Sequence, residues 1–286
     1  MTPLPRIMIE PAVRAALLED LGRAGDITAE AVIPDDTRAA VAFVAREPGT
    51  IAGLGCAAIA FDLLDPSLGL DIVIPDGGTV APGDVIARIE GKARAILSAE
   101  RTALNFLGQL SGVATATAGI AAAIAHTRAR ITCTRKTIPG LRALQKYAVR
   151  CGGGKNHRMG LYDAILIKEN HIAAAGGLTA AFQAAQRYAA QASFIQVEVE
   201  TLKQLDEALQ AGVTMVLLDN MSLDTLRQAV QMAAGKCSLE ISGGVTLDQL
   251  RAYAETGVDR ISVGGLIKDI QAVDFSMRFQ DRPVER

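Results

Sequence analysis

The chain has 286 residues, of which 50% are hydrophobic and 21% are charged, and its formal net charge at pH 7 is −2. This composition is typical of a globular protein and excludes a disordered, collagen-like or disulfide-scaffold chain. The near-neutral charge argues against a strongly basic nucleic-acid binder. Apolar residues are spread along the chain, and no unbroken run approaches the roughly 18 to 20 residues that a membrane span requires. We therefore expect a soluble protein of one large or two modest domains.

The N-terminus and the cysteines indicate the compartment. Glu10, Glu19 and Asp20 stand where a signal peptide would need an uninterrupted apolar stretch, so we expect no export signal and a cytoplasmic location. The four cysteines lie far apart with no CxxC pair, which favours small buried side chains over a disulfide framework or a zinc site. They are Cys56, Cys133, Cys151 and Cys237.

Residues 1–110 predict an α+β domain. Helix-like segments at 11–21 and 56–64 accompany strand-like segments at 37–46, 71–74, 84–89 and 92–96, which Pro-Gly and Asp-Gly-Gly turns separate. Such turns are typical of an antiparallel sheet. A helix over 99–110 is expected to connect to the next domain, with Arg101 in its first turn behind Ser98, where a cation opposes the helix dipole and a bound anion would offset the cost.

Residues 111–269 predict a (β/α) barrel. Nearly continuous β-branched or aliphatic runs, which indicate parallel strands buried on both faces, occur at 131–135, 164–167, 195–199, 215–218, 239–241 and 260–263. Amphipathic helices are expected at 178–191, 202–211, 223–233 and 247–256. The strand-to-strand period of about 22 residues suits a compact barrel. At least one further strand is needed, and either residues 108–125 or the glycine-rich loop could hold it. The residues alone do not indicate where the tail from residue 270 lies.

Positive charge is concentrated in one window of the sequence. Between Arg128 and Lys168 there are ten Lys or Arg residues and one acid, Asp163, which gives this window +9 and leaves −11 on the rest. His126, His157 and His171 lie in or beside it. A solvated basic face is one explanation, and a pocket for a polyanionic small molecule is the other.

Every predicted barrel strand ends in polar residues or glycine, and barrel chemistry is found at these ends. Backbone N–H groups at two glycine turns could cradle phosphate, the first of them just before a helix expected to begin near Thr246. In chain order the ends are Thr134-Arg135-Lys136, Lys168-Glu169-Asn170-His171, Glu198 with Glu200, Asp219-Asn220, Ser242-Gly243-Gly244 and Val263-Gly264-Gly265.

The acids at these ends suit a divalent cation or ribose hydroxyls. Glu198 and Asp219 follow neighbouring strands, and Glu200 shares the side-chain parity of Glu198. Among so many bases, carboxylates are suitable ligands for Mg²⁺. The alternative is that one of them simply pairs with a nearby Lys or Arg.

The segment 151–158, CGGGKNHR, is glycine-rich and basic. It is not a Walker A loop, because Asn156 stands where Ser or Thr must bind the metal. Arg135, Arg158 and Lys168 are better interpreted as fixed donors to carboxylate or phosphate.

The run TRKTIPGLRALQKYAVRCGGGKNHRMGLYDAILIKENHI at 134–172 resembles the quinolinate phosphoribosyltransferase family. LEDLGRAGDIT at 18–28, LSAERTALNFLGQLSGVATAT at 97–117, VEVE, LLDN and ISGGV follow the family's patterns in the same order. The resemblance covers essentially the whole chain. It implies an open α/β sandwich domain followed by an incomplete seven-stranded (β/α) barrel, with the tail at 270–286 returning to the first domain.

The resemblance also implies a reaction and its residues. Phosphoribosyl would pass from 5-phosphoribosyl 1-diphosphate (PRPP) to the ring nitrogen of quinolinate, with loss of the 2-carboxylate, in a Mg²⁺-dependent homodimer of NAD biosynthesis. The implied quinolinate contacts are Thr134, Arg135, Lys136, His157 and Arg158, with Arg101 from the partner subunit. The implied PRPP and metal contacts are Lys168, His171, Glu198 and Asp219, with the phosphate turns Ser242 to Gly244 and Val263 to Gly265. Lys136, Glu198 and Asp219 are the expected catalytic residues.

Two alternatives share this scaffold. One is a phosphoribosyltransferase-like protein associated with molybdenum transport, which we expect to lack the Lys-Glu-Asn-His run at 168–171. The other is a non-catalytic sensor of a phosphoribosyl ligand, which would have no need to keep both acids and all the bases.

Overall fold

The computed structural model describes residues 2–245 and 247–280, and they form two compact units. The first unit takes the residues up to Ala118, Thr137–Gly153 and the residues from Leu266 on, and the second takes Gly119–Lys136 and Gly154–Gly265. The prediction placed residues 1–110 and the tail at 270–286 in one domain and residues 111–269 in the other, and the first unit additionally contains Thr137–Gly153.

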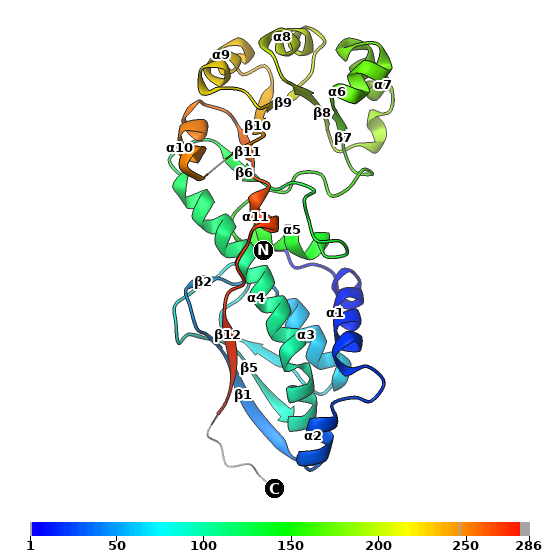
Figure 1. Ribbon diagram of the computed structural model, residues 1–286, viewed down its shortest axis with the longest axis vertical. Coiled ribbons are helices and arrows are strands. Elements are labelled where there is room, and N and C mark those ends of the chain that lie inside the picture. The colour runs from blue at the N-terminus through cyan, green and yellow to red at the C-terminus, as the bar shows by residue number, and fades with distance from the viewer. Residues whose placement is uncertain (1, 246, 281–286) are drawn as a thin grey trace. The chain divides into compact units, whose positions relative to one another are not determined.

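An antiparallel sheet is the centre of the first unit (Figure 1). Its four strands lie in the order β12 (Phe275–Phe279), β1 (Arg38–Ala45), β5 (Val85–Lys92) and β3 (Leu70–Ile72). A separate pair joins β2 (Gly49–Thr50) to β4 (Thr79–Val80). Because β12 pairs with β1 from Val41 opposite Phe279 to Ala45 opposite Phe275, the described part of the tail belongs to this sheet.

Helices α1 to α5 accompany this sheet, with the bounds α1 (Arg6–Leu21), α2 (Ile27–Val32), α3 (Leu54–Leu64), α4 (Ala93–Ala123) and α5 (Arg142–Cys151). Helix α3 packs on the sheet through an edge-to-face contact of Phe61 with Phe43, whose ring centroids are 5.8 Å apart. The sequence analysis missed α2, which has only six residues and begins at the Asp26 cap, whose Oδ1 accepts from the N–H groups of Thr28 and Ala29.

Helix α4 corrects two predictions. It begins at Ala93, so the strand expected at 92–96 is wrong, and Arg101 lies in the third turn, where it is too far from the helix N-terminus to oppose the dipole there. The helix is long and apolar enough to cross a membrane by length and composition alone, but half of the qualifying window is buried inside the protein. The buried stripe that includes Leu104, Leu107 and Leu110 is that of a core helix.

A parallel sheet forms the second unit. Its strands lie in the order β6 (Arg130–Thr132), β11 (Arg260–Ser262), β10 (Ser238–Ser242), β9 (Met215–Asp219), β8 (Ile195–Val199) and β7 (Ile165–Ile167). Helices follow the strands and lie on their outer side (Figure 1). They are α6 (Glu169–Ala175), α7 (Leu178–Arg187), the 3-10 helix η1 (Ala189–Gln191), α8 (Leu202–Gln210), α9 (Leu223–Ala233) and α10 (Leu247–Glu255). The short helix α11 (Gly265–Lys268) follows β11, and its residues from Leu266 on belong to the first unit.

The described sheet has six strands where seven were expected. Residues 108–125 are largely α4, and the glycine-rich loop contributes only an isolated bridge between Lys155 and Thr132. Gly153 has φ +84°, a left-handed conformation that is incompatible with an extended strand at that point. The bridge therefore stands where the seventh strand was predicted.

Candidate active site

The carboxyl ends of the parallel strands bring the predicted polar residues of the second unit to one edge of its sheet. Lys168 follows β7 and Glu198 lies in β8, at positions that continue the pairing of Ile167 with Val197. The Nζ of Lys168 donates to Oε2 of Glu198 at 2.6 Å. The Glu198 side chain is 12% exposed and that of Lys168 is 45% exposed. The alternative that one acid pairs with a nearby base is thus observed for Glu198.

Asp219 and Ser242 end neighbouring strands and are paired in register. Asn220 and Gly243, which follow these two strand ends, are in close contact. A Cβ on Gly243 would lie 2.1 Å from Oδ1 of Asn220 and 3.0 Å from Oδ1 of Asp219. Gly243 also has φ +88°. A residue with a side chain is disfavoured at Gly243 on both counts. The helix start predicted near Thr246 lies outside the described residues, and α10 is described from Leu247.

The segment after β6 lies beside the second glycine turn. The hydroxyl of Thr134 accepts from the backbone N–H of Lys136 at 3.1 Å. The Lys136 side chain passes over Gly264, where an added Cβ would lie 3.3 Å from its Cδ and 3.6 Å from its Nζ. Val263 donates its N–H to the carbonyl of Thr132 at 3.0 Å, which joins the ends of β11 and β6. A cation and a glycine turn that both suit phosphate therefore lie together.

Arg158 and Arg135 form a second cationic group. Burial lowers the pKa of the Arg158 guanidinium, the Arg135 cation lowers it further, and Asp163 and Glu198 oppose both effects. The loop after Arg158 is held by Asp163, whose two carboxylate oxygens accept from the N–H groups of Met159 and Gly160 at 2.8 Å each. Two neighbouring guanidinium groups favour a ligand with two negative charges.

His157 is 8% exposed and directed into the unit. Its Nε2 lies 2.7 Å from Oε1 of Gln196, and its Nδ1 accepts from the backbone N–H of Arg158 at 2.8 Å. Both ring nitrogens are therefore in hydrogen bonds within the protein, which the expected contact with quinolinate did not anticipate.

His171 and Glu200 make hydrogen bonds within their own segments of the chain. Nδ1 of His171 accepts from the backbone N–H of Lys168 and so caps α6. The side chains of His171 and Arg158 line a cavity of about 340 Å³ that runs along β7. Glu200 is exposed, and its backbone N–H donates to Gln204.

The basic window divides between the two units. Arg142, Lys146 and Arg150 lie in α5 of the first unit. In the second unit Arg128 pairs with Asp259 at 3.4 Å, and Arg130 donates to backbone carbonyls. The bases at the strand ends of the second unit are Arg135, Lys136, Arg158 and Lys168.

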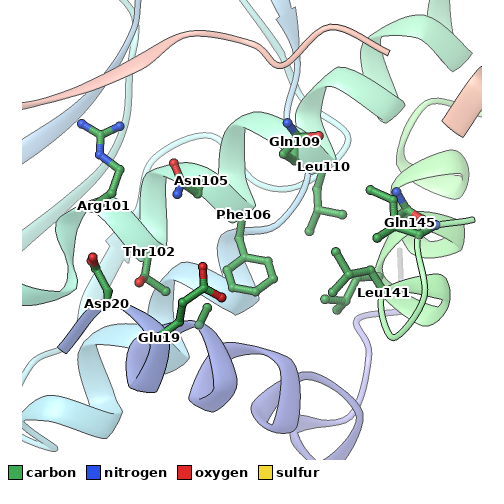
Figure 2. Close-up of a pocket in the computed structure, with 13 residues that line it drawn as sticks. Glu19, Asp20, Arg101, Thr102, Asn105, Phe106, Gln109, Leu110, Leu141 and Gln145 are labelled. Atoms are coloured by element: carbon green, nitrogen blue, oxygen red, sulfur yellow. Dashed lines mark hydrogen bonds between the residues drawn. The ribbon is translucent and has the colours of Figure 1, made fainter. Parts of the chain in front are cut away.

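Arg101 is exposed and belongs to the first unit. It lines a cavity of about 350 Å³ between α1, α4, α5 and the segment before α5 (Figure 2). Figure 2 shows Glu19 and Asp20 on α1 across from Thr102 and Phe106 of α4. This cavity thus combines an apolar floor with charged groups of both signs.

The sequence analysis missed three residues that organise the site, namely Asp163 as a loop anchor and the buried Gln196 and Glu240. Glu240 is fully buried in a run of aliphatic residues. A carboxylate inside such a strand is the signal that could have identified it. The four cysteines are all buried and carry free thiols.

Comparisons with known proteins show the family and the fold. Residues 26–111 match the N-terminal domain and residues 113–278 the C-terminal domain of the quinolinate phosphoribosyl transferase family. A probable nicotinate-nucleotide pyrophosphorylase (carboxylating) of Bacillus subtilis is 42% identical, over 91% of this chain and 89% of the relative. The corresponding protein of Mycobacterium leprae is 42% identical, over 93% and 95%. The structure of the nicotinate-nucleotide pyrophosphorylase from Francisella tularensis has 41% identity and a TM-score of 0.93, over 97% of this chain and 98% of that one. The chain therefore belongs to the quinolinate phosphoribosyltransferase family.

Proposed function

We propose that this enzyme transfers phosphoribosyl from PRPP to the ring nitrogen of quinolinate and releases the 2-carboxylate, which yields nicotinate mononucleotide, diphosphate and CO₂ for NAD biosynthesis. The observation that carries the proposal is the meeting of Arg135, Arg158 and the Lys168–Glu198 pair at one edge of the parallel sheet, in a chain of this family. The two substrates are polyanions, and this edge offers fixed cations.

Quinolinate is a dianion, and the cations on and after β6 and in the glycine-rich segment suit its two carboxylates. Arg135 and Arg158 would each present a planar fork to a carboxylate. Thr134 supports Lys136 through the 3.1 Å backbone bond. We assign quinolinate binding to these four residues, with His157 behind Arg158.

PRPP would lie across the ends of the remaining strands. The turns Ser242–Gly244 and Val263–Gly265 offer backbone N–H groups to its phosphates. Lys168 and His171 add donors, and the carboxylates of Glu198 and Asp219 suit the ribose hydroxyls. The close packing of Gly243 on Asn220 supports this assignment, because it holds Asp219 beside the first turn.

The chemistry then proceeds in two steps. The quinolinate nitrogen forms a bond to C1′ as the C1′–O bond breaks, and diphosphate departs with the electron pair. Glu198 and Asp219 stabilise the positive charge that develops on the ribose. The pyridinium ring then accepts the electrons of the C2–carboxylate bond, CO₂ leaves, and a proton is delivered to C2. We assign that proton to Lys136.

The donor set fits Mg²⁺ that arrives with its substrate. No group of three or more His, Cys, Asp or Glu side chains lies together within residues 2–245 and 247–280. Mg²⁺ is commonly held by one or two carboxylates together with substrate phosphates, and Glu198 and Asp219 are the residues that would hold it. When bound, it would neutralise diphosphate and make it a better leaving group.

We further propose a cytoplasmic homodimer in which Arg101 reaches the quinolinate site of the partner subunit. Arg101 is exposed on α4, whereas the other proposed quinolinate residues lie in the second unit. Mixing Arg101→Ala with Lys168→Met protein tests this arrangement. Mixed dimers carry one intact site and regain activity, whereas inactivity of dimers shown to be mixed contradicts the sharing.

The activity is tested directly with purified protein, Mg²⁺, PRPP and quinolinate, and with nicotinate as a parallel acceptor. We expect CO₂ and nicotinate mononucleotide from quinolinate and no turnover of nicotinate. PRPP binding without turnover of quinolinate would instead favour the transport-associated relative or a sensor.

A further inference from the structure

Asp163 is the only acidic residue in the basic window at 128–168, which holds ten Lys or Arg residues. It lies between Arg158 and the strand β7, and it closes the intervening segment into a compact loop. Its Oδ2 accepts from the backbone N–H of Met159 and its Oδ1 from that of Gly160, each at 2.8 Å. Hydrogen bonds to a carboxylate are charge-assisted and about twice as strong as those between neutral groups. This acid has no role in the proposed binding of either substrate.

The loop is also anchored to the parallel sheet. The backbone carbonyl of Asp163 accepts two bonds from Ser193, one from its N–H at 2.8 Å and one from its hydroxyl at 2.7 Å. Ser193 precedes β8, and Ile165 of β7 donates its N–H to the carbonyl of Phe194 at 3.0 Å. Asp163 therefore ties the loop to the β7–β8 pair through both its carboxylate and its carbonyl.

This clamp acts on the backbone beside Arg158. The peptide N–H that follows Arg158 belongs to Met159 and is held by Asp163, and the N–H of Arg158 itself donates to Nδ1 of His157 at 2.8 Å. The Arg158 side chain lines the cavity of about 340 Å³ along β7, together with Leu161 from the same loop. The conformation of the loop thus determines where the guanidinium enters this cavity.

Arg158 needs this restraint because a second cation lies near it. Burial and the Arg135 cation lower the pKa of Arg158, whereas the Asp163 and Glu198 carboxylates raise it. Two like charges repel each other and separate when their backbones are free to move. A guanidinium that is already held in place loses less conformational entropy when it binds a carboxylate.

We propose that Asp163 is a positioning residue, which fixes the loop after Arg158 so that the guanidinium is in place for quinolinate before the substrate arrives. This inference rests on the proposed role of Arg158 in binding quinolinate. It gives the one acid of the basic window a function beyond neutralising charge. A loop anchor with a purely structural role would affect the free energy of unfolding, and its effect on quinolinate binding would not depend on Arg158.

A double-mutant cycle on quinolinate binding measures this dependence. Asn keeps the size of the Asp163 side chain, but its NH₂ cannot accept from the second backbone N–H. We expect Asp163→Asn to raise the Kd for quinolinate about tenfold in calorimetric titration. In an Arg158→Ala background the same substitution should change the Kd by less than about twofold, because the group that Asp163 positions is absent. Equal fold-changes in the two backgrounds would overturn the proposal. Arg158→Lys, which lacks the planar fork, replaces Arg158→Ala if that variant binds too weakly to titrate.

Asp84→Asn is the matched control. In the first unit, Oδ2 of Asp84 accepts from the backbone N–H of Ala81 at 2.8 Å, three residues earlier in the chain, as Asp163 does from Gly160. We expect the Kd for quinolinate of Asp84→Asn to stay within about twofold of that of the unsubstituted protein. A rise as large as that of Asp163→Asn would contradict the positioning role.

Amide hydrogen exchange tests the clamp without any substitution. The N–H groups of Met159 and Gly160 should be protected in the free enzyme as well as with quinolinate bound, because their acceptor belongs to the protein. Protection that appears only with quinolinate would show that the ligand orders the loop, and it would overturn the proposal even if Asp163→Asn does not fold. If the unsubstituted protein does not bind quinolinate, the proposed function fails, whereas the exchange rates still decide whether the loop is held in advance.

Discussion

Substitution of Gly243 by alanine tests how the glycine turn after β10 is built, and Gly244→Ala is its matched control. Both glycines have positive φ, +88° and +57°, so both alanines pay the cost of a left-handed backbone, which is roughly 1–2 kcal/mol. They differ in their surroundings, because a Cβ at Gly243 would lie 2.1 Å from Oδ1 of Asn220, whereas nothing lies within 4 Å of a Cβ at Gly244.

The clash at Gly243 has a cost that the structure defines. Oδ1 of Asn220 must move by at least about 1.3 Å, from 2.1 Å to the 3.4 Å of ordinary contact. The Asn220 amide then loses its 2.8 Å bond to Oδ2 of Asp219. Loss of that bond adds about 1 kcal/mol. We expect Gly244→Ala to lower the free energy of unfolding by roughly 1 kcal/mol and Gly243→Ala by roughly 2–4 kcal/mol.

The assays are urea unfolding followed by circular dichroism, since the chain has no tryptophan, and steady-state kinetics with PRPP varied. Displacement of Asp219 in Gly243→Ala should lower kcat/KM for PRPP by about 100-fold, because small misplacements of reacting groups have effects of this size. Equal destabilisation by the two alanines, or an unmoved Asn220 in a crystal structure of Gly243→Ala, would refute the reasoning.

Three further predictions concern the helix α4, the proton donor and the buried thiols. Gly119→Ala on the exposed side of α4 should stabilise the protein by up to about 1 kcal/mol. Gly112→Ala should destabilise it by roughly 1–3 kcal/mol, because the added Cβ would lie 2.1 Å from the carbonyl oxygen of Gln271. Urea unfolding midpoints compare the two variants, and equal shifts would contradict the close packing at Gly112. Lys136→Met should release diphosphate faster than CO₂ in a single turnover with carboxyl-labelled quinolinate, and equal rates would remove Lys136 as the donor. Burial raises the pKa of the Cys56 thiol to about 12, so the folded state keeps a proton that the unfolded state loses from about pH 9. The free energy of unfolding should therefore fall as the pH rises from about 9 to about 12, by up to about 1.4 kcal/mol per pH unit. Cys56→Ala should show a shallower decline over the same pH range.

The strands of the second unit could be predicted because each is a short aliphatic run between helices of clear period. The observed bounds differ by at most one residue from the predicted ones at every end but one. The exception is the strand predicted at 131–135, which ends three residues earlier, at Thr132. The strand at 92–96 was wrong because Ala-Arg-Ala-Ile fits a strand or a helix equally well over so few residues. These residues are helical because they form the first turn of the 31-residue helix α4.

Some residues of the candidate site could be predicted from the sequence and others could not. Lys168 and Glu198 could be placed together because parallel strands end at one edge, and their 2.6 Å bond follows from that register. Gln196 could not, because nothing in the sequence distinguishes it from other polar residues within a strand. Glu240 does carry a signal, since it is a carboxylate inside a strand whose neighbours Leu239 and Ile241 are aliphatic. The direction of the His157 ring was also beyond the sequence, since it depends on a backbone N–H and on an amide from another strand.

The cations at the strand ends make the site dependent on its ligand. Burial and the Arg135 charge lower the pKa of Arg158, so the folded protein holds this cation at a cost in free energy. The fixed bonds to His157 and from Asp163 to the following loop allow little relaxation. In the proposed site, a dianion between the two guanidinium groups would remove the repulsion without moving either backbone. Under the proposed function, the same preorganisation that disfavours the free site would therefore favour the site with quinolinate bound.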